Sequence, residues 1–79
     1  METLNEKLIK HYHCFNTERF FLDEHNEEEG FLSIVSSSIE DPCPIKLCRG
    51  IAKFCKKNIN YEKYPFIYVG AWVFETDKL

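Results

Sequence analysis

The amino-acid sequence predicts one α+β domain over residues 1–79, in the order helix–β–β–helix–β with a small antiparallel sheet. Three observations lead to this class. An amphipathic helical pattern fills residues 45–58, two strand-like runs flank a short polar link at residues 26–30, and a third strand-like run fills residues 65–74. A chain of 79 residues holds a single hydrophobic core near the lower limit of size, so we expect one globular domain.

The first helix is predicted over residues 3–14. Thr3-Leu-Asn-Glu6 matches the capping box, in which the Thr and Glu side chains each bond to a free backbone N–H at the helix start. Apolar residues follow at steps of three and four and therefore share one helix face: Leu4, Leu8, Tyr12 and Phe15.

A β-hairpin is predicted next, with strands at residues 19–25 and 31–37. The link Asn26-Glu-Glu-Glu-Gly30 is polar, and its Gly stands where a longer hairpin loop needs a positive φ. A break in regular structure follows. Asp41 or Cys43 is the candidate cap of the next helix, and Pro44 suits its first turn, where a missing N–H costs nothing.

The helix over residues 45–58 has two separate faces. At 100° per residue its apolar positions cover one arc: Ile45, Leu47, Cys48, Ile51, Ala52, Phe54, Cys55 and Ile59. The remaining arc holds five cations and Gly50, and we name these cations the basic helix face: Lys46, Arg49, Lys53, Lys56 and Lys57.

Residues 65–74 are predicted to form the last strand. Because successive side chains alternate between faces, one face is aliphatic and the other aromatic. A strand that is apolar on both sides needs cover on both sides, from two helices or from one helix and a partner chain. We expect the second helix on the aliphatic face. For the aromatic face (Phe66, Tyr68, Trp72 and Phe74) we prefer packing against the first helix over the stacking of bases. Gly70 among these rings suggests a close approach by another group, so Gly70→Val should destabilise.

Charge is unevenly distributed along the chain. Residues 1–42 carry ten acidic and three basic side chains, whereas residues 43–79 carry three acidic and seven basic, and the formal net charge is −3. The basic helix face has three interpretations: a solvated surface, a phosphate-contacting surface, or a docking surface for an acidic partner, including the acidic hairpin of a second copy. The net negative charge makes nucleic acid the less favoured partner.

An acidic patch on the hairpin is the first candidate for partner binding: Asp23, Glu24, Glu27, Glu28 and Glu29. Five carboxylates in seven residues exceed what a loop needs for solubility, and such a patch can bind the basic groove of a protein that handles nucleic acid. The basic helix face is the secondary candidate.

Metal and catalytic sites are not predicted. Four Cys and three His supply ligand types for zinc, but their spacing lacks the paired pattern of structural sites; the remaining zinc hypothesis joins Cys43 to His11, His13 or Cys14. Cys14 beside His13 makes no base–nucleophile contact on a helix, and His25 with Asp23 and Glu24 lies on a solvated hairpin. We expect no enzyme activity and no cofactor.

The sequence therefore favours a non-catalytic protein-binding module, a small acidic inhibitor or adaptor of a larger complex of the kind that phages and mobile elements encode. The alternatives are a nucleic-acid-binding module that uses residues 46–57, and a small zinc-binding regulatory domain. Twelve aromatic residues in so short a chain favour a homodimer or a tightly bound partner.

The longest apolar run is half the length of a membrane span, and no targeting segment is visible, so we expect an intracellular, cytoplasmic protein without membrane contact.

Overall fold

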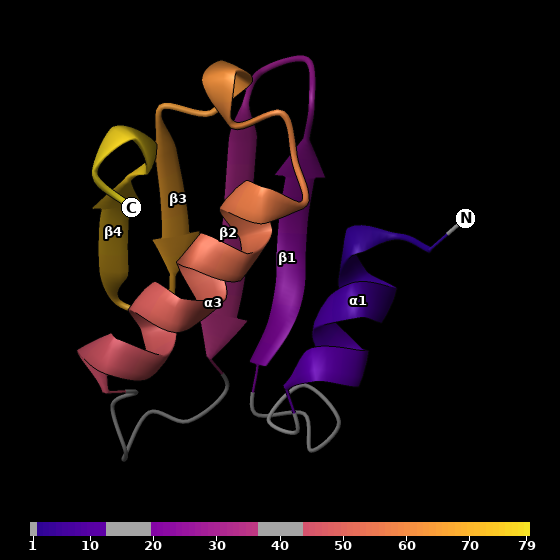
Figure 1. Ribbon diagram of the computed structural model, residues 1–79, viewed down its shortest axis with the longest axis vertical. Helices are drawn as coiled ribbons and strands as arrows, with labels where there is room; N and C mark the ends of the chain where they lie inside the picture. The colour runs from indigo at the N-terminus through magenta and orange to yellow at the C-terminus, as the bar shows by residue number, and fades with distance from the viewer. Residues whose placement is uncertain (1, 13–19, 37–43) are drawn as a thin grey trace.

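The computed structural model describes residues 2–12, 20–36 and 44–79, and shows two helices on a four-stranded sheet (Figure 1). The α+β class is confirmed. Two details of the prediction differ: the run at residues 65–74 is a hairpin of two strands, and the sheet is mixed. The elements are α1 (Leu4–His11), β1 (Phe20–Asn26), β2 (Phe31–Ser36), α3 (Ile45–Lys57), η1 (Tyr61–Lys63), β3 (Phe66–Val69), β4 (Trp72–Glu75) and η2 (Thr76–Lys78).

Helix α1 begins as predicted and ends earlier. Thr3 is the N-cap, and its Oγ1 accepts a hydrogen bond from the backbone N–H of Glu6 at 3.1 Å. The Glu6 carboxylate accepts from the Thr3 hydroxyl, so only the Thr half of the capping box binds backbone. The helix stops at His11 because Tyr12 takes an extended conformation. Residues 13 and 14 of the predicted helix lie outside the described residues.

Helix α3 matches the prediction closely. Cys48, Ile51, Ala52 and Cys55 are buried, and the cations of the opposite arc face solvent, with Lys56 half-buried. Pro44 is the N-cap rather than the first helical residue, and it makes no side-chain capping bond. The two suggested caps, Asp41 and Cys43, lie outside the described residues.

The sheet has the order β1-β2-β3-β4. The two outer pairs, β1–β2 and β3–β4, are antiparallel hairpins, whereas the central pair β2–β3 is parallel. A parallel pair needs a crossover connection, and α3 provides it between β2 and β3. The expectation of an all-antiparallel sheet was therefore wrong at its centre.

The predicted last strand is split at Gly70. This residue has φ +60°, and its N–H donates to the carbonyl of Ile34 at 2.8 Å. A Cβ at Gly70 would meet nothing closer than Ser36 Cβ at 3.9 Å, so no close approach explains the glycine. The turn requires it, because a positive φ is strained for residues with a side chain. We still expect Gly70→Val to destabilise the fold, but because of backbone strain at a positive φ and not because of a close contact.

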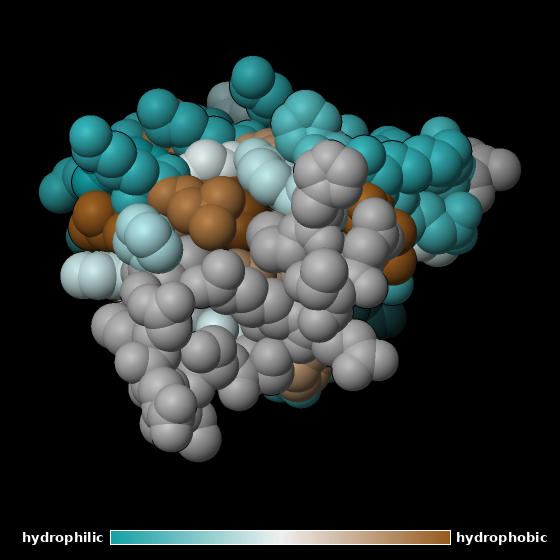
Figure 2. Space-filling view, turned by 90° about the horizontal axis from the view of Figure 1, so that it is seen from below, coloured by the Kyte–Doolittle hydropathy of each residue, from teal (hydrophilic) through white to brown (hydrophobic). Residues whose placement is uncertain are grey.

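The core lies between the sheet and the helices. Both helices cover the same face of the sheet: α3 packs on β3 and β4, and α1 packs beside it, with His11 stacked on Phe54 at 4.6 Å between ring centroids (Figure 1). Thirteen buried residues form this layer: Leu4, Leu8, Phe20, Leu32, Ile34, Cys48, Ile51, Ala52, Cys55, Tyr64, Ile67, Val69 and Phe74. Figure 2 shows the molecule from below, with hydrophilic residues along the upper margin of the view and hydrophobic residues beneath them.

Gly30 ends the turn between β1 and β2 and lies against Lys63 of η1. It has φ +68°, and a Cβ there would overlap the carbonyl oxygen of Lys63. Gly30→Ala therefore meets both backbone strain and a backbone clash, whereas Gly70→Ala meets only the strain. We expect Gly70→Ala to lower the free energy of unfolding by about 1–2 kcal/mol and Gly30→Ala to lower it by clearly more, up to loss of the fold. Denaturant unfolding of both variants checks this, and equal effects at the two positions would contradict the close approach.

Candidate interaction surfaces

The predicted acidic patch divides into two parts. Asp23 and Glu24 lie in β1, where the register shifts between Leu22 and Glu24, and both are exposed. The other three carboxylates belong to the turn between β1 and β2, which we name the hairpin tip: Glu27, Glu28 and Glu29. The two groups of carboxylates therefore belong to different surfaces.

The hairpin tip has a defined conformation. Asn26 Oδ1 accepts hydrogen bonds from the backbone N–H groups of Glu28 and Glu29, both at 3.0 Å. Gly30 presses the end of the turn against Lys63. Three exposed carboxylates are thus presented on a backbone that is held from both sides.

The second face of the sheet is apolar, and no helix of the described residues covers it. Strand register defines it, since paired residues of neighbouring strands point to the same side. Phe21 pairs with Val35, Tyr68 with Val73, and Ser33 with Tyr68. We name this surface the open face, and its apolar members are Phe21, Phe31, Val35, Phe66, Tyr68 and Val73.

Aromatic rings run across the open face. The ring centroids of Phe31 and Tyr68 are 5.2 Å apart, and those of Phe66 and Tyr68 are 6.5 Å apart. Phe21 is 45 % exposed, Phe66 39 % and Val73 56 %. Our expectation that the aromatic residues of the last strand pack against the first helix is therefore wrong for Phe66 and Tyr68. It fails because both helices cover the opposite face of the sheet, where the turn at Gly70 places Phe74 beside Ile67.

Carboxylates stand at both edges of the open face. Glu24 of the edge strand β1 pairs with Ser33, and Glu75 of the edge strand β4 pairs with Phe66. Both are exposed. No Lys or Arg occupies a paired position on this face in the described strands. A phosphate backbone would therefore meet negative charge here, unlike on the aromatic sheets that bind RNA.

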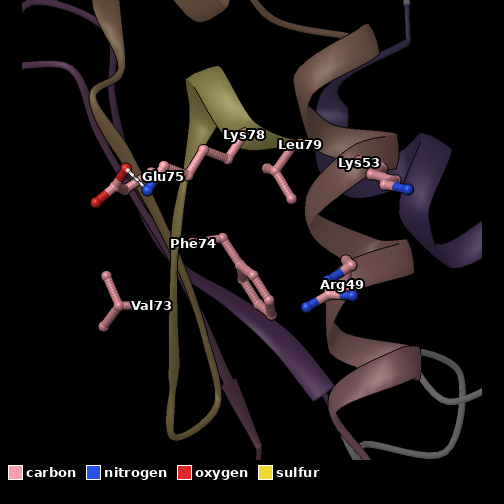
Figure 3. Close-up of a pocket in the computed structure, with 7 residues that line it drawn as sticks. All are labelled: Arg49, Lys53, Val73, Phe74, Glu75, Lys78 and Leu79. Atoms are coloured by element: carbon pink, nitrogen blue, oxygen red, sulfur yellow. Dashed lines mark ion pairs between the residues drawn. The ribbon is translucent and has the colours of Figure 1, made fainter.

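The basic helix face borders two shallow hollows. One, of about 400 Å³, lies between α3 and the segment β4–η2; Figure 3 shows Arg49 extending toward the ring of Phe74 across it. The second, of about 450 Å³, shares Lys53 and Leu79 with the first and adds Lys56, Lys57 and Tyr61. We name the two together the basic groove. It combines cations with a few apolar side chains and one carboxylate, Glu75, which pairs with Lys78 at 3.2 Å.

The wall of the groove is fixed by buried polar contacts. Thr76 is buried, and its hydroxyl donates to the carbonyls of Tyr64 and Pro65. Lys56 Nζ donates to the backbone carbonyl of Leu79 at 3.0 Å and lies 4.7 Å from the ring centroid of Tyr61. Lys56 thus holds the C-terminal segment on α3, whereas Arg49 and Lys53 form no ion pair with any described residue. Sequence reasoning missed Thr76, because nothing in its neighbourhood marks it as buried.

Two histidines of the predicted metal and acid–base clusters contact aromatic side chains. His25 Nε2 lies 2.8 Å from the Tyr64 hydroxyl, and His11 stacks on Phe54. Among the described residues no three His, Cys, Asp or Glu side chains are placed to hold one metal ion. The other members of the zinc hypothesis, Cys14, His13 and Cys43, lie outside those residues.

Comparisons with known proteins give no relative. No family model matches the chain, and neither a curated protein nor a solved structure matches it. No helix in the described part of the chain is long and apolar enough to cross a membrane.

The buried thiols should be chemically inert. Cys48 and Cys55 are both fully buried, and burial raises the pKa of Cys55 from 9.0 to about 12, so the reactive thiolate is scarce. We expect neither residue to react with a thiol reagent at pH 8 until the protein unfolds. Peptide mass spectrometry after pulse labelling measures each Cys separately. Rapid labelling of both in folded protein would contradict their place in the core. Cys43 lies outside the described residues; because the sequence places it between two prolines before the helix, we expect it to react with the same reagent in the folded protein.

Stability should fall at alkaline pH. The folded protein holds the Cys55 proton more tightly than the unfolded chain does, so this contribution is complete below about pH 9 and is lost as the pH rises toward 12. Burial, together with the carboxylate of Glu27, also raises the pKa of Tyr64 above 10.0, in the same direction. For Cys55 we expect a loss of about 2 kcal/mol between pH 8.5 and 10.5. Urea unfolding of the wild type and of Cys55→Ala across this range measures it. Parallel curves for the two proteins would refute it.

Proposed function

We propose that this chain is a non-catalytic protein-binding module, and that its binding surface is the open face. The observation that supports the proposal is the position of both helices on one side of the sheet. The other side keeps aromatic and aliphatic side chains 39–56 % exposed at Phe21, Phe66 and Val73. Apolar patches of this kind on small proteins are typical of interaction sites.

The chemistry of the open face defines the partner. Its centre is apolar, and Glu24 and Glu75 mark its two edges. A second copy packed face to face would offer Glu24 no Lys or Arg from its own paired strand positions, because the described strands carry none. The complementary partner is a protein with an apolar surface flanked by Lys or Arg. The role as inhibitor or adaptor of a larger complex rests on this assignment.

The test compares two pairs of substitutions with similar exposure. Phe21→Ser with Phe66→Ser removes apolar surface from the open face, while Ile45→Ser with Tyr61→Ser removes it elsewhere. All four residues are 39–45 % exposed, so both variants should fold. In affinity purification with quantitative mass spectrometry, we expect the first variant to lose at least ten-fold of a specific partner and the second to retain it.

Two further measurements make the result decisive. A photo-crosslinking amino acid at position 66 should join that partner, while one at position 49 should not. Glu24→Gln with Glu75→Gln should weaken binding and reduce its dependence on salt. Retention by the open-face variant, or capture abolished by nuclease, would overturn the proposal. Capture abolished by nuclease would make the basic helix face the first candidate for the binding surface, with nucleic acid as its partner.

A further inference from the structure

The molecule carries a second pair of complementary features, which lie apart from the aromatic centre of the open face and share only Val73 and Glu75 with it. The hairpin tip presents three exposed carboxylates, and the basic groove presents Arg49, Lys53 and Lys57 without ion pairs to the described residues. Cations that have no ion-pair partner and lie beside a hollow favour the binding of an anionic group there.

Within one molecule these two features are not paired: among the described residues, no carboxylate of the tip forms an ion pair with a cation of the groove. The tip joins β1 to β2, whereas the hollow lined by Arg49 and Phe74 lies along β4, at the opposite edge of the sheet (Figure 1). The tip is held against η1 by the contact of Gly30 with Lys63, which fixes it in this unpaired position. A contact of the tip with Arg49 and Lys53 therefore joins two copies.

We propose that the hairpin tip of one copy binds in the basic groove of another. The guanidinium of Arg49 faces the hollow over Phe74 and can bind one carboxylate through two N–H donors. Lys53 lies between the two hollows and lines both, so it can bind a second carboxylate. Because the tip is already held in one conformation, ordering it costs little on binding.

The geometry sets the type of assembly. Tip and groove are different surfaces, so the contact is head-to-tail and each bound copy still offers a free tip or a free groove. Exposed ion pairs contribute little individually and are screened by salt. The assembly is therefore weak, concentration-dependent and salt-sensitive. It leaves the open face of every copy accessible, and a chain of copies would bind a repeated partner with increased avidity.

Sedimentation velocity of the purified protein tests the proposal. At low salt we expect the mean mass to rise above that of the 9.4 kDa monomer with increasing concentration, and to return to it at about 0.5 M salt, where the screening length is about 4 Å. The tip variant Glu27→Gln, Glu28→Gln, Glu29→Gln should remain monomeric. Its formal net charge is zero instead of −3. Lower net charge generally promotes association, so a monomer here cannot result from charge repulsion.

The groove variant Arg49→Gln, Lys53→Gln should also remain monomeric, while its matched control Lys7→Gln, Lys10→Gln removes two cations from α1 and should associate like the wild type. The decisive experiment mixes the two monomeric variants. The tip variant keeps a groove and the groove variant keeps a tip, so the mixture should form a one-to-one complex that grows no further.

Three outcomes would overturn the proposal: a monomeric wild type at millimolar concentration and low salt, undiminished association of the tip or groove variant, or no complex in the mixture. Association that survives high salt and disappears in Phe21→Ser, Phe66→Ser would instead assign self-contact to the open face. Circular dichroism of each variant confirms that it is folded. Loss of the protein partner leaves this assembly intact, so the two proposals fail separately.

Discussion

The structure depends on the contact of α3 with β3 and β4. The buried side of α3 is made mostly of small side chains, with Cys48, Ala52 and Cys55 all fully buried. With Ile51 they join the core layer that also holds Leu32, Ile34, Ile67 and Val69. The same helix joins β2 to β3 in parallel, so one packing surface determines both the core and the strand order.

This arrangement also determines which surfaces remain available. Because α1 packs on α3, the two helices together cover one face of the sheet, and no helix within residues 2–12, 20–36 and 44–79 covers the other. The cations of α3 lie on its exposed arc, with Arg49 and Lys53 at the hollow beside β4, and carboxylates lie on the edge strands and the hairpin tip. Positive and negative side chains are thus concentrated on different elements, with the ion pair of Lys78 and Glu75 where they meet. Such separation guides the orientation of an approaching partner more than it raises affinity.

Local patterns in the sequence predicted the elements well, and long-range geometry was the part they missed. The arc of α3 could be predicted because helical periodicity depends only on neighbours within two turns. The Thr3 cap and the acidic turn before Gly30 are local as well. The run at residues 65–74 was read as one strand because its residue types favour strands throughout, and Gly70 alone marked the turn. The parallel pairing of β2 with β3 has no local signature.

The candidate surfaces show the same division. Five carboxylates were predicted as one patch because they are close in sequence, yet the shift in strand register directs Glu24 to the open face and leaves the tip separate. The open face and the basic groove depend on which residues of β3 and β4 share a side. That arrangement follows from the turn at Gly70. If residues 65–74 are treated as one strand, every residue after Gly70 is assigned to the wrong face of the sheet.

The parallel central pair has a consequence for how the chain folds. Each outer pair is a hairpin of neighbouring residues, but Leu32 must find Ile67, 35 positions further along the chain. Closing so distant a contact is slow compared with forming a hairpin. During synthesis the β1–β2 hairpin is made first, and the inner edge of β2 has no strand to pair with until β3 is complete. Until then the edge of β2 beside Phe31 and Val35 is an unpaired strand edge, of the kind that pairs readily with another chain.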